Sequence, residues 1–283
     1  MEMCRPFVKW AGGKRQLVEE LLRSRPSKYN RYIEPFIGGG ALFFELKPKN
    51  AYISDINEEL INIYTVVRDE VGALIAELKK HEKNYRESDP QEYFYAVRNI
   101  DRETRYNRWS RVEKAARLIF LNKTCFNGLY RVNSRGEFNT PFGSYVNPAI
   151  VDEQNLLACS RVLASADIAA AGFEHVLETA KKGDFVYFDP PYVPLTSTAN
   201  FTSYTGEGFD LEMQTRLRDV CELLDRKGVL WMLSNSHTPF VLDLYRDKFN
   251  IRAVEASRAI NCKADGRGKV TEVIVTNYEM TLE

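Results

Sequence analysis

A short apolar run that ends in two prolines sets the strongest limit on how this chain can fold. Residues 185–188 read Phe-Val-Tyr-Phe, and Asp189-Pro190-Pro191-Tyr192 follows directly. Such a run is typical of a buried strand in a parallel sheet. Because proline cannot continue the hydrogen-bonded ladder, the strand must stop there. Asp189 is therefore expected at the carboxyl edge of a sheet, where open α/β sheets bind their ligands.

The side chains expected at this edge suit a flat base that carries an exocyclic amino group. Asp189 offers a carboxylate acceptor, and the carbonyl of Pro190 offers a second acceptor next to it. The prolines stiffen the backbone and keep the aromatic face of Tyr192 close by. These residues alone do not distinguish adenine from cytosine.

A glycine-rich turn earlier in the chain predicts a nucleoside site. Residues 36–40 read Phe-Ile-Gly-Gly-Gly, between a predicted strand and a predicted apolar helix. The arrangement is typical of the first βα turn of a nucleotide-binding sheet. It is not the dinucleotide fingerprint GxGxxG, because Phe43 stands in place of the last glycine. A nucleoside cofactor without a pyrophosphate is therefore favoured, with tight strand–helix packing as the structural alternative.

An acidic residue closes the next predicted strand, over residues 51–57. An acid at this point of a nucleotide-binding sheet hydrogen-bonds a ribose diol, and we favour that role for Asp55. The alternative is that Asp55 caps the helix expected over residues 58–68.

The N-terminal segment Lys9-Trp10-Ala11-Gly12-Gly13-Lys14 precedes a helix expected over residues 16–23. Its adjacent glycines allow a ligand to approach the backbone closely, while Trp10 offers a flat face and Lys14 a cation. A loop before a helix binds anions, and the anion here would be a carboxylate. A surface turn is the alternative interpretation.

The pattern becomes helical after residue 58, where Ser110 and Glu113 fit a capping box. Residues 98–135 hold ten basic and three acidic side chains, although the whole chain carries 39 of each sign. This basic patch favours phosphate binding, and a solvated helix face is the alternative.

Two short alternating runs flank Ser134-Arg135-Gly136, which is a hairpin signature. A two-stranded ribbon fits the major groove of DNA. Arg131 has the donors to bind guanine O6 and N7, and Asn127 can contact a base or the backbone.

Strands and helices alternate again after residue 146. We expect helices over 152–164, 173–180, 210–226 and 239–248, and strands over 168–171, 228–234, 251–256 and 270–277. A polar loop over 193–209 is expected to cover the site, and a basic, glycine-rich loop over 261–269 is expected to reach a phosphate backbone.

The cysteine pattern and the hydropathy narrow the class of protein. The five cysteines are scattered without a CxxC pair, which predicts buried small side chains, a reducing compartment and no zinc site. No segment approaches the roughly 18 apolar residues of a membrane span. We therefore expect a soluble, cytoplasmic protein.

Taken in order, these motifs resemble the DNA adenine-N6 methyltransferases of the Dam/DpnII type (D12 class, alpha group). The resemblance is carried by residues 9–14, 34–40, 54–55, 127–131 and 189–192. It implies an α/β fold, namely a Rossmann-like methyltransferase sheet that uses S-adenosyl-L-methionine, with an inserted, mostly helical DNA-recognition domain that carries a β-hairpin. The catalytic domain would comprise residues 1–57 and 146–283, and the insertion residues 58–145.

The resemblance also implies the reaction, which is methyl transfer to an adenine flipped out of duplex DNA, in the sequence GATC. It implies a catalytic set of Asp189, Pro190 and Tyr192. The implied cofactor-binding residues are Trp10, Lys14, Phe36, Gly38, Gly40, Asp55 and Asp189. The implied DNA-binding residues are Lys9, Asn127, Leu129, Arg131, Pro141 and Tyr145.

Double-stranded DNA is the implied partner, without a metal, and we expect a monomer in the cytoplasm that associates with the nucleoid. Other functions fit parts of the pattern. A duplex-binding regulator would need only the basic insertion, and cytosine N4, an RNA adenine or a protein amide would suit the same acceptor pair. A solitary methylase and the partner of a restriction enzyme are both consistent with the sequence.

Overall fold

A computed structural model describes residues 4–12, 14, 17–193, 209–257 and 269–280. The chain divides into two compact units. Unit 1 comprises Met1–Gly13, Gly38–Lys49 and Asn57–Ala170, and unit 2 comprises Lys14–Ile37, Asn50–Ile56 and Ala171–Glu283. Residues 194–208 of the expected polar loop and residues 261–268 of the expected basic loop lie outside the described residues.

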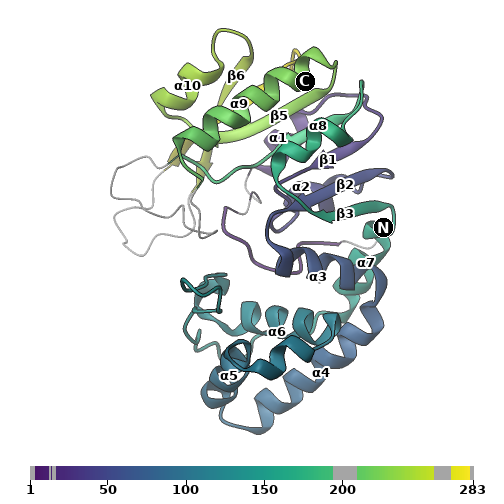
Figure 1. The fold of residues 1–283 in the computed structure, drawn as a ribbon, viewed down its shortest axis with the longest axis vertical. Helices are drawn as coiled ribbons and strands as arrows, with labels where there is room; N and C mark the ends of the chain where they lie inside the picture. Colours follow the sequence, from purple (N-terminus) through teal and green to yellow (C-terminus); the bar gives the residue numbers. More distant parts are fainter. Residues whose placement is uncertain (1–3, 13, 15–16, 194–208, 258–268, 281–283) are drawn as a thin grey trace. The chain divides into compact units, whose positions relative to one another are not determined.

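A seven-stranded, mostly parallel sheet confirms the predicted α/β fold (Figure 1). Its strands are β1 (Tyr32–Glu34), β2 (Ala51–Asp55), β3 (Ala166–Ala170), β4 (Phe185–Phe188), β5 (Leu230–Ser236), β6 (Asn250–Ser257) and β7 (Lys269–Thr276). The order across the sheet is β3-β2-β1-β4-β5-β7-β6. From β1 the strand order runs toward β3 on one side of the sheet, and from β4 it runs toward the later strands on the other side. The boundary between β1 and β4 is therefore a topological switch point, where ligands of open α/β sheets bind.

The central strands are parallel and the last strand is not. β1 pairs in parallel with β2 and β4, and β4 pairs in parallel with β5. All residues of β1 and β4 are buried, as expected for parallel strands that are covered on both faces. β7 is antiparallel to both β5 and β6. β5 continues to Ser236, two residues beyond the prediction, because this end of the strand pairs with β7.

Unit 2 contains every strand of the sheet except β3, which falls within unit 1. Its helices are α1 (Val18–Ser24), α8 (Val176–Thr179), α9 (Leu211–Arg226) and α10 (Pro239–Tyr245), with the 3-10 turn η4 (Phe173–His175). The α9 helix begins where the Asp210 carboxylate accepts the amide of Met213. The α10 helix begins in the same way, with the hydroxyl of Thr238 accepting the amide of Val241. These caps agree with the predicted helix starts.

Unit 1 is mostly helical (Figure 1). Its α-helices are α2 (Ala41–Leu46), α3 (Glu58–Asp69), α4 (Val71–Glu87), α5 (Pro90–Asn99), α6 (Arg111–Thr124) and α7 (Glu153–Leu163), with 3-10 turns η1 (Ile100–Arg102), η2 (Thr104–Arg108) and η3 (Phe126–Gly128). The capping box of Ser110 and Glu113 is confirmed at the start of α6. α6 lies against α3, α4 and α5, and its apolar side chains form the core of this unit.

The predicted hairpin forms as a tight turn closed by single bridges, without two regular strands. Val132 is bridged to Phe138, and the amide of Gly136 donates to the carbonyl of Asn133. Gly136 has a φ of 79°, in the left-handed region that suits glycine. The ribbon is tied to the preceding helical segment, because the Asp101 carboxylate accepts the amide of Phe138.

None of the helices within the described ranges is both long and apolar enough to cross a membrane. In the same ranges, no group of three or more His, Cys, Asp or Glu side chains is placed to hold a metal ion. Four cysteines, Cys4, Cys125, Cys159 and Cys221, are buried as free thiols, which confirms for them the predicted packing role.

Candidate functional site

Four side chains of unit 2 meet at the carboxyl end of β4, and we call them the sheet-edge cluster: Lys14, Asp189, Tyr192 and Glu272. The Lys14 ammonium lies 2.8 Å from Oδ1 of Asp189 and 4.2 Å from the centroid of the Tyr192 ring. Only 8% of the Lys14 side chain and 18% of the Asp189 side chain are exposed. The two opposite charges therefore compensate each other in a site with little access to water.

Glu272 belongs to this cluster because of the direction of β7. The Tyr192 hydroxyl donates to Oε2 of Glu272 at 2.7 Å. Glu272 lies early in β7 and opposite Ser236, near the carboxyl end of β5. An antiparallel strand brings its first residues to the edge where the parallel strands end. Glu272 could not be singled out from the sequence, since the direction of a terminal strand leaves no local signal there.

The charge of Asp189 depends on these neighbours. Burial raises the pKa of Asp189 to about 6, the Lys14 ammonium opposes this rise, and the Glu272 charge adds a smaller upward contribution. Burial also raises the pKa of the Tyr192 hydroxyl well above its usual range, so this hydroxyl stays protonated and donates. At neutral pH the cluster therefore holds an ionised Asp189 that accepts hydrogen bonds.

Three buried polar side chains fix the backbone on either side of the aromatic ring, and we call them the backbone clamp. Gln214 donates to the carbonyl of Pro191 at 2.8 Å, and Ser236 donates to the carbonyl of Val193 at 2.8 Å. Asn235 accepts the amide of Val193 at 3.3 Å and donates to Gln214 at 2.9 Å. The segment that follows Asp189 therefore has a defined conformation.

The glycine turn after β1 has a backbone that requires glycine. Gly38 and Gly40 have φ angles of 46° and 70°, in the left-handed region. A Cβ on Gly40 would lie 2.7 Å from the Tyr64 hydroxyl, and a Cβ on Gly38 would lie 3.0 Å from the Trp10 indole. These contacts give both glycines a packing role, which is compatible with a turn that also approaches a ligand.

Phe36, at the start of this turn, belongs to an aromatic cluster within unit 2. Its ring centroid lies 5.6 Å from that of Phe173 and 5.7 Å from that of Phe209. The next residue anchors the turn to the neighbouring strand, because the amide of Ile37 donates to the carbonyl of Ser54. Phe36 is therefore held at the switch point, next to the end of β2.

Asp55 is the last residue of β2, and Ile56, directly after it, is 63% exposed. The following helix is capped by Asn57, whose Oδ1 accepts the amide of Leu60 at 2.9 Å. The alternative that Asp55 caps this helix is therefore wrong. The ribose role remains the interpretation of Asp55.

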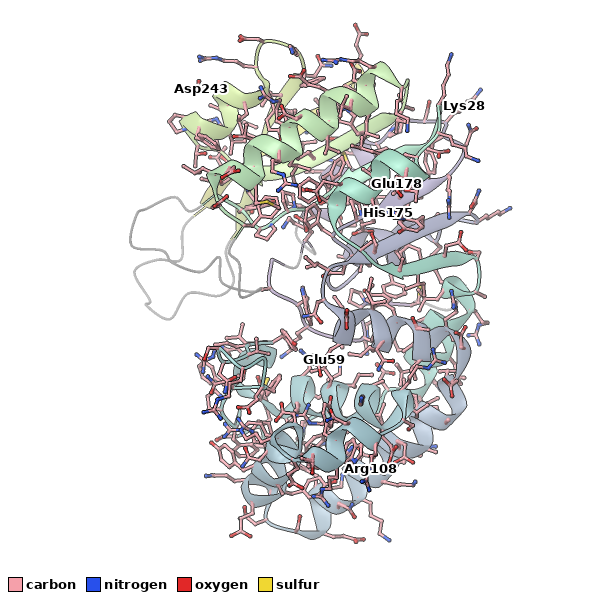
Figure 2. All side chains as sticks on the ribbon, in the orientation of Figure 1. Lys28, Glu59, Arg108, His175, Glu178 and Asp243 are labelled. Atoms are coloured by element: carbon pink, nitrogen blue, oxygen red, sulfur yellow. The ribbon has the colours of Figure 1, made fainter. Side chains whose placement is uncertain are left out.

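Trp10 lies in unit 1, where one face of its indole is covered. It stacks on Tyr130 with a centroid distance of 5.0 Å and an angle of 23° between the ring planes. The hydroxyls of Tyr130 and Tyr106 donate to the two carboxylate oxygens of Glu59, each at 3.0 Å. Glu59, labelled in Figure 2, lies in the first turn of α3. No motif in the sequence indicates this support for Trp10.

Lys9 is held against the ribbon by a buried asparagine on α6. The Asn122 side chain accepts the amide of Lys9 at 2.8 Å and donates to the carbonyls of Lys9 at 2.8 Å and Gly128 at 2.9 Å. The Lys9 ammonium lies 5.4 Å from the ring centroid of Tyr145. Unit 1 therefore brings together two residues of the predicted DNA-binding set, Lys9 and Tyr145, beside Gly128. Asn122 itself was missed, because a lone asparagine in a helix gives no signal.

The other predicted DNA-binding residues lie on the surface of unit 1. Leu129 is 37% exposed, and Pro141 and Arg131 are exposed. Arg131 donates from Nη2 to the carbonyl of Asn139 at 2.9 Å, which orients its guanidinium along the ribbon. Asn127 has a φ of 55°, a left-handed conformation that asparagine tolerates better than most residues.

The basic patch is smaller than predicted. Arg117 is fully buried, pairs with Asp101 at 2.7 Å and donates to two backbone carbonyls near the end of α5. Its inclusion in the phosphate-binding patch was wrong, because the helical period turns this side chain into the core. Arg111 pairs with Glu70 at 2.8 Å, whereas Arg108, labelled in Figure 2, is exposed.

Comparison with known proteins gives matches over most of the chain. The model of the D12 class N6 adenine-specific DNA methyltransferases matches residues 10–260. The chain is 50% identical to the type II methyltransferase M1.LlaDCHI of Lactococcus lactis subsp. cremoris, over 97% of this chain and 95% of that protein. It is 44% identical to the type II methyltransferase M.MjaIII of Methanocaldococcus jannaschii, over 97% and 99% of the two chains.

A third relative, a DNA adenine methylase of Vibrio cholerae, is 35% identical over 97% of this chain and 96% of that protein. The matched lengths cover the glycine turn, residues 58–145 and the motif that follows β4. The chain therefore belongs to the D12 class N6 adenine-specific DNA methyltransferases.

Proposed function

We propose that this enzyme transfers a methyl group from S-adenosyl-L-methionine to N6 of an adenine flipped out of duplex DNA, with GATC as its target sequence. The observation that carries the proposal is the placement of Asp189 at the carboxyl end of β4, at the switch point of the sheet and next to the Tyr192 ring. This carboxylate already lies beside a nitrogen cation, the Lys14 ammonium, at 2.8 Å from Oδ1. A base amino group would be accepted in the same way.

The proposed roles at the base follow from the chemistry of adenine. The N6 lone pair is delocalised into the ring, so the amino group is a poor nucleophile. Asp189 and the carbonyl of Pro190 would accept the two N6 hydrogens and favour a pyramidal nitrogen, which helps most in the transition state. Tyr192 would stack on the flipped base. The positive charge that develops on N6 would be stabilised by the Asp189 carboxylate.

The side chains proposed for the cofactor have suitable chemistry for it. S-adenosyl-L-methionine, when bound, supplies a methyl group on a positively charged sulfur. Lys14 and Trp10 would contact the methionine end, and Asp55 would bind the ribose. Phe36, Gly38 and Gly40 would line the turn, whose left-handed glycines leave backbone rather than side chains facing a ligand. Asp189 would orient the methyl acceptor toward the donor.

The proposed DNA contacts divide into base reading and support of the opened duplex. Arg131 would bind a guanine and Lys9 would read another base. Leu129 and Pro141 would contact the thymine methyl group, and their exposure suits that contact. Asn127 and Tyr145 would hold the opened duplex and its phosphates. Residues 58–145 would form the recognition domain, in a monomeric cytoplasmic enzyme that acts on nucleoid DNA.

Loss of the Asp189 carboxylate tests the proposal. We expect Asp189→Ala to bind duplex DNA normally but to incorporate no tritium from methyl-labelled S-adenosyl-L-methionine, because the N6 acceptor is gone. Asp184→Ala is the matched control, since Asp184 is a buried aspartate directly before the same strand, where it accepts the amide of Lys181. This control should retain transfer. Normal incorporation by Asp189→Ala would contradict the assigned role.

A further inference from the structure

We infer that Glu272 is a positioning residue for methyl transfer: its carboxylate holds the Tyr192 ring in the orientation that receives the target base. The inference rests on the proposed function, because it assumes that Tyr192 stacks on the flipped adenine. It adds a residue from β7, outside the motif that follows β4 and outside the matched residues 10–260 of the family model.

The geometry fixes Tyr192 at both of its ends. The backbone clamp holds the carbonyl of Pro191 and both backbone groups of Val193, so the position of the Tyr192 Cα is set. A tyrosine ring still has two free torsions from that point. The hydrogen bond of 2.7 Å from its hydroxyl to Glu272 restrains the far end of the ring. Together these contacts leave the ring little freedom to leave its orientation.

The strand pair β5–β7 carries a residue from each restraint on Tyr192, the backbone clamp and the hydrogen bond to its hydroxyl. Ser236, a member of the backbone clamp, lies directly opposite Glu272 in the β5–β7 ladder. The distance between the two restraints is therefore set by regular backbone hydrogen bonding, which is more rigid than a loop. Preorganisation of this kind lowers the cost of ordering a side chain when the substrate arrives.

The carboxylate also gives the ring an electrostatic bias. A phenol that donates to a carboxylate presents a more electron-rich ring face, and such faces attract cations. The Lys14 ammonium, 4.2 Å from the ring centroid, shows that attraction in this structure. Positive charge develops on the base nitrogen as the methyl group is transferred, so the ring would stabilise the transition state more than the ground state.

Three variants, assayed on a duplex with one GATC site and tritium-labelled cofactor, test the inference. Glu272→Ala should lower kcat by roughly ten- to a hundredfold, as small misplacements near the reacting atoms do, with duplex affinity unchanged. Glu272→Gln should restore most of kcat, because its amide oxygen still accepts the Tyr192 hydroxyl. Thr271→Ala, the exposed neighbour on β7, should behave as the unaltered protein.

A double-mutant cycle with Tyr192→Phe tests whether Glu272 acts through the Tyr192 hydroxyl or whether its loss disturbs the site in general. Phenylalanine keeps the ring and removes the hydroxyl, so Glu272→Ala should cause no further loss of kcat in the Tyr192→Phe background. Losses that multiply in the double variant would overturn the inference, and so would an unchanged kcat in Glu272→Ala. Thermal unfolding identifies variants that fail to fold. If Glu272→Ala fails, the cycle is run with Glu272→Leu and judged by the same criteria.

The pH profile supplies a readout that a merely structural glutamate would not move. Glu272→Gln removes a negative charge that faces Asp189, so the acid limb of kcat/KM should move to lower pH. Among the described residues, the other titratable groups that face Asp189 are Lys14, Tyr187 and Tyr192, and this variant leaves them in place. An unmoved limb would overturn the electrostatic part. An unaltered protein without methyl transfer would overturn the proposed function instead.

Discussion

At the scale of single residues, the ion pair of Lys14 and Asp189 describes the site before substrate enters. The carboxylate proposed to accept the adenine amino group forms an ion pair with an ammonium at 2.8 Å, and the same ammonium lies over the Tyr192 ring. Lys14 thereby offsets the burial that would otherwise favour the neutral form of Asp189. The cation keeps the acceptor ionised near neutral pH.

Acid should abolish methyl transfer by protonating Asp189. Burial raises the pKa of Asp189 to about 6, and the active form is the carboxylate, so activity is present above that pH and lost below it. Measured on duplex DNA, kcat/KM reports the free enzyme and should fall about tenfold per pH unit on the acid side. A flat profile down to about pH 5, in protein that is still folded, would contradict this account of Asp189.

Truncation of Arg131 should relax the choice of sequence. One bidentate guanine contact contributes about 1–3 kcal/mol of discrimination, so Arg131→Ala should narrow the difference in kcat/KM between GATC and AATC duplexes by that amount. Arg135→Ala, in the exposed turn of the ribbon, is the control and should leave discrimination unchanged. Full discrimination in Arg131→Ala would remove Arg131 from base reading.

At the scale of elements, two helices of unit 1 each hold the N-terminal segment through a buried asparagine that hydrogen-bonds to its backbone. Asn122 of α6 accepts and donates hydrogen bonds at the backbone of Lys9, and Asn155 of α7 does so at the backbone of Arg5. Both asparagines are buried. Only Asn122 also reaches the ribbon, through the carbonyl of Gly128.

These asparagines form a matched pair for mutation. Each change to alanine leaves buried backbone groups without partners and should lower the free energy of unfolding by about 2–3 kcal/mol, measured by urea denaturation. Asn122→Ala should in addition reduce discrimination between GATC and AATC, because Lys9 and Gly128 lose their common anchor. Asn155→Ala should keep it. Equal discrimination in the two variants would show that Asn122 has no role beyond stability.

Most of the elements could be predicted from local sequence, because their signals are local. The apolar run of β4, its proline stop and the capping box of α6 each depend on residues that are neighbours in the chain. Counting charges along the sequence does not tell which side chains are exposed. Arg117 was counted in the basic patch, but its position on the helix places it in the core. The hairpin lacks regular strands because side chains such as Asp101 hold its backbone groups instead.

At the scale of the whole molecule, the candidate site depends on sheet topology that the sequence does not display. Asp189 lies at the carboxyl edge of the sheet, beside the switch point between β1 and β4. The position of Asp189 at this edge could be anticipated by analogy with nucleotide-binding sheets. The reversed direction of β7 could not. It brings Glu272 to Tyr192 across 80 residues of sequence, and no periodicity or motif indicates such a contact.

Digestion of plasmid DNA tests the central claim most directly. The plasmid is incubated with the protein and S-adenosyl-L-methionine, then cut in parallel by one restriction enzyme that adenine methylation at GATC blocks and by one that ignores it. Nucleoside analysis of the same DNA identifies the methylated base. The account predicts resistance to the first enzyme, cleavage by the second and N6-methyladenine. Cleavage by both enzymes, or N4-methylcytosine in place of N6-methyladenine, would contradict it.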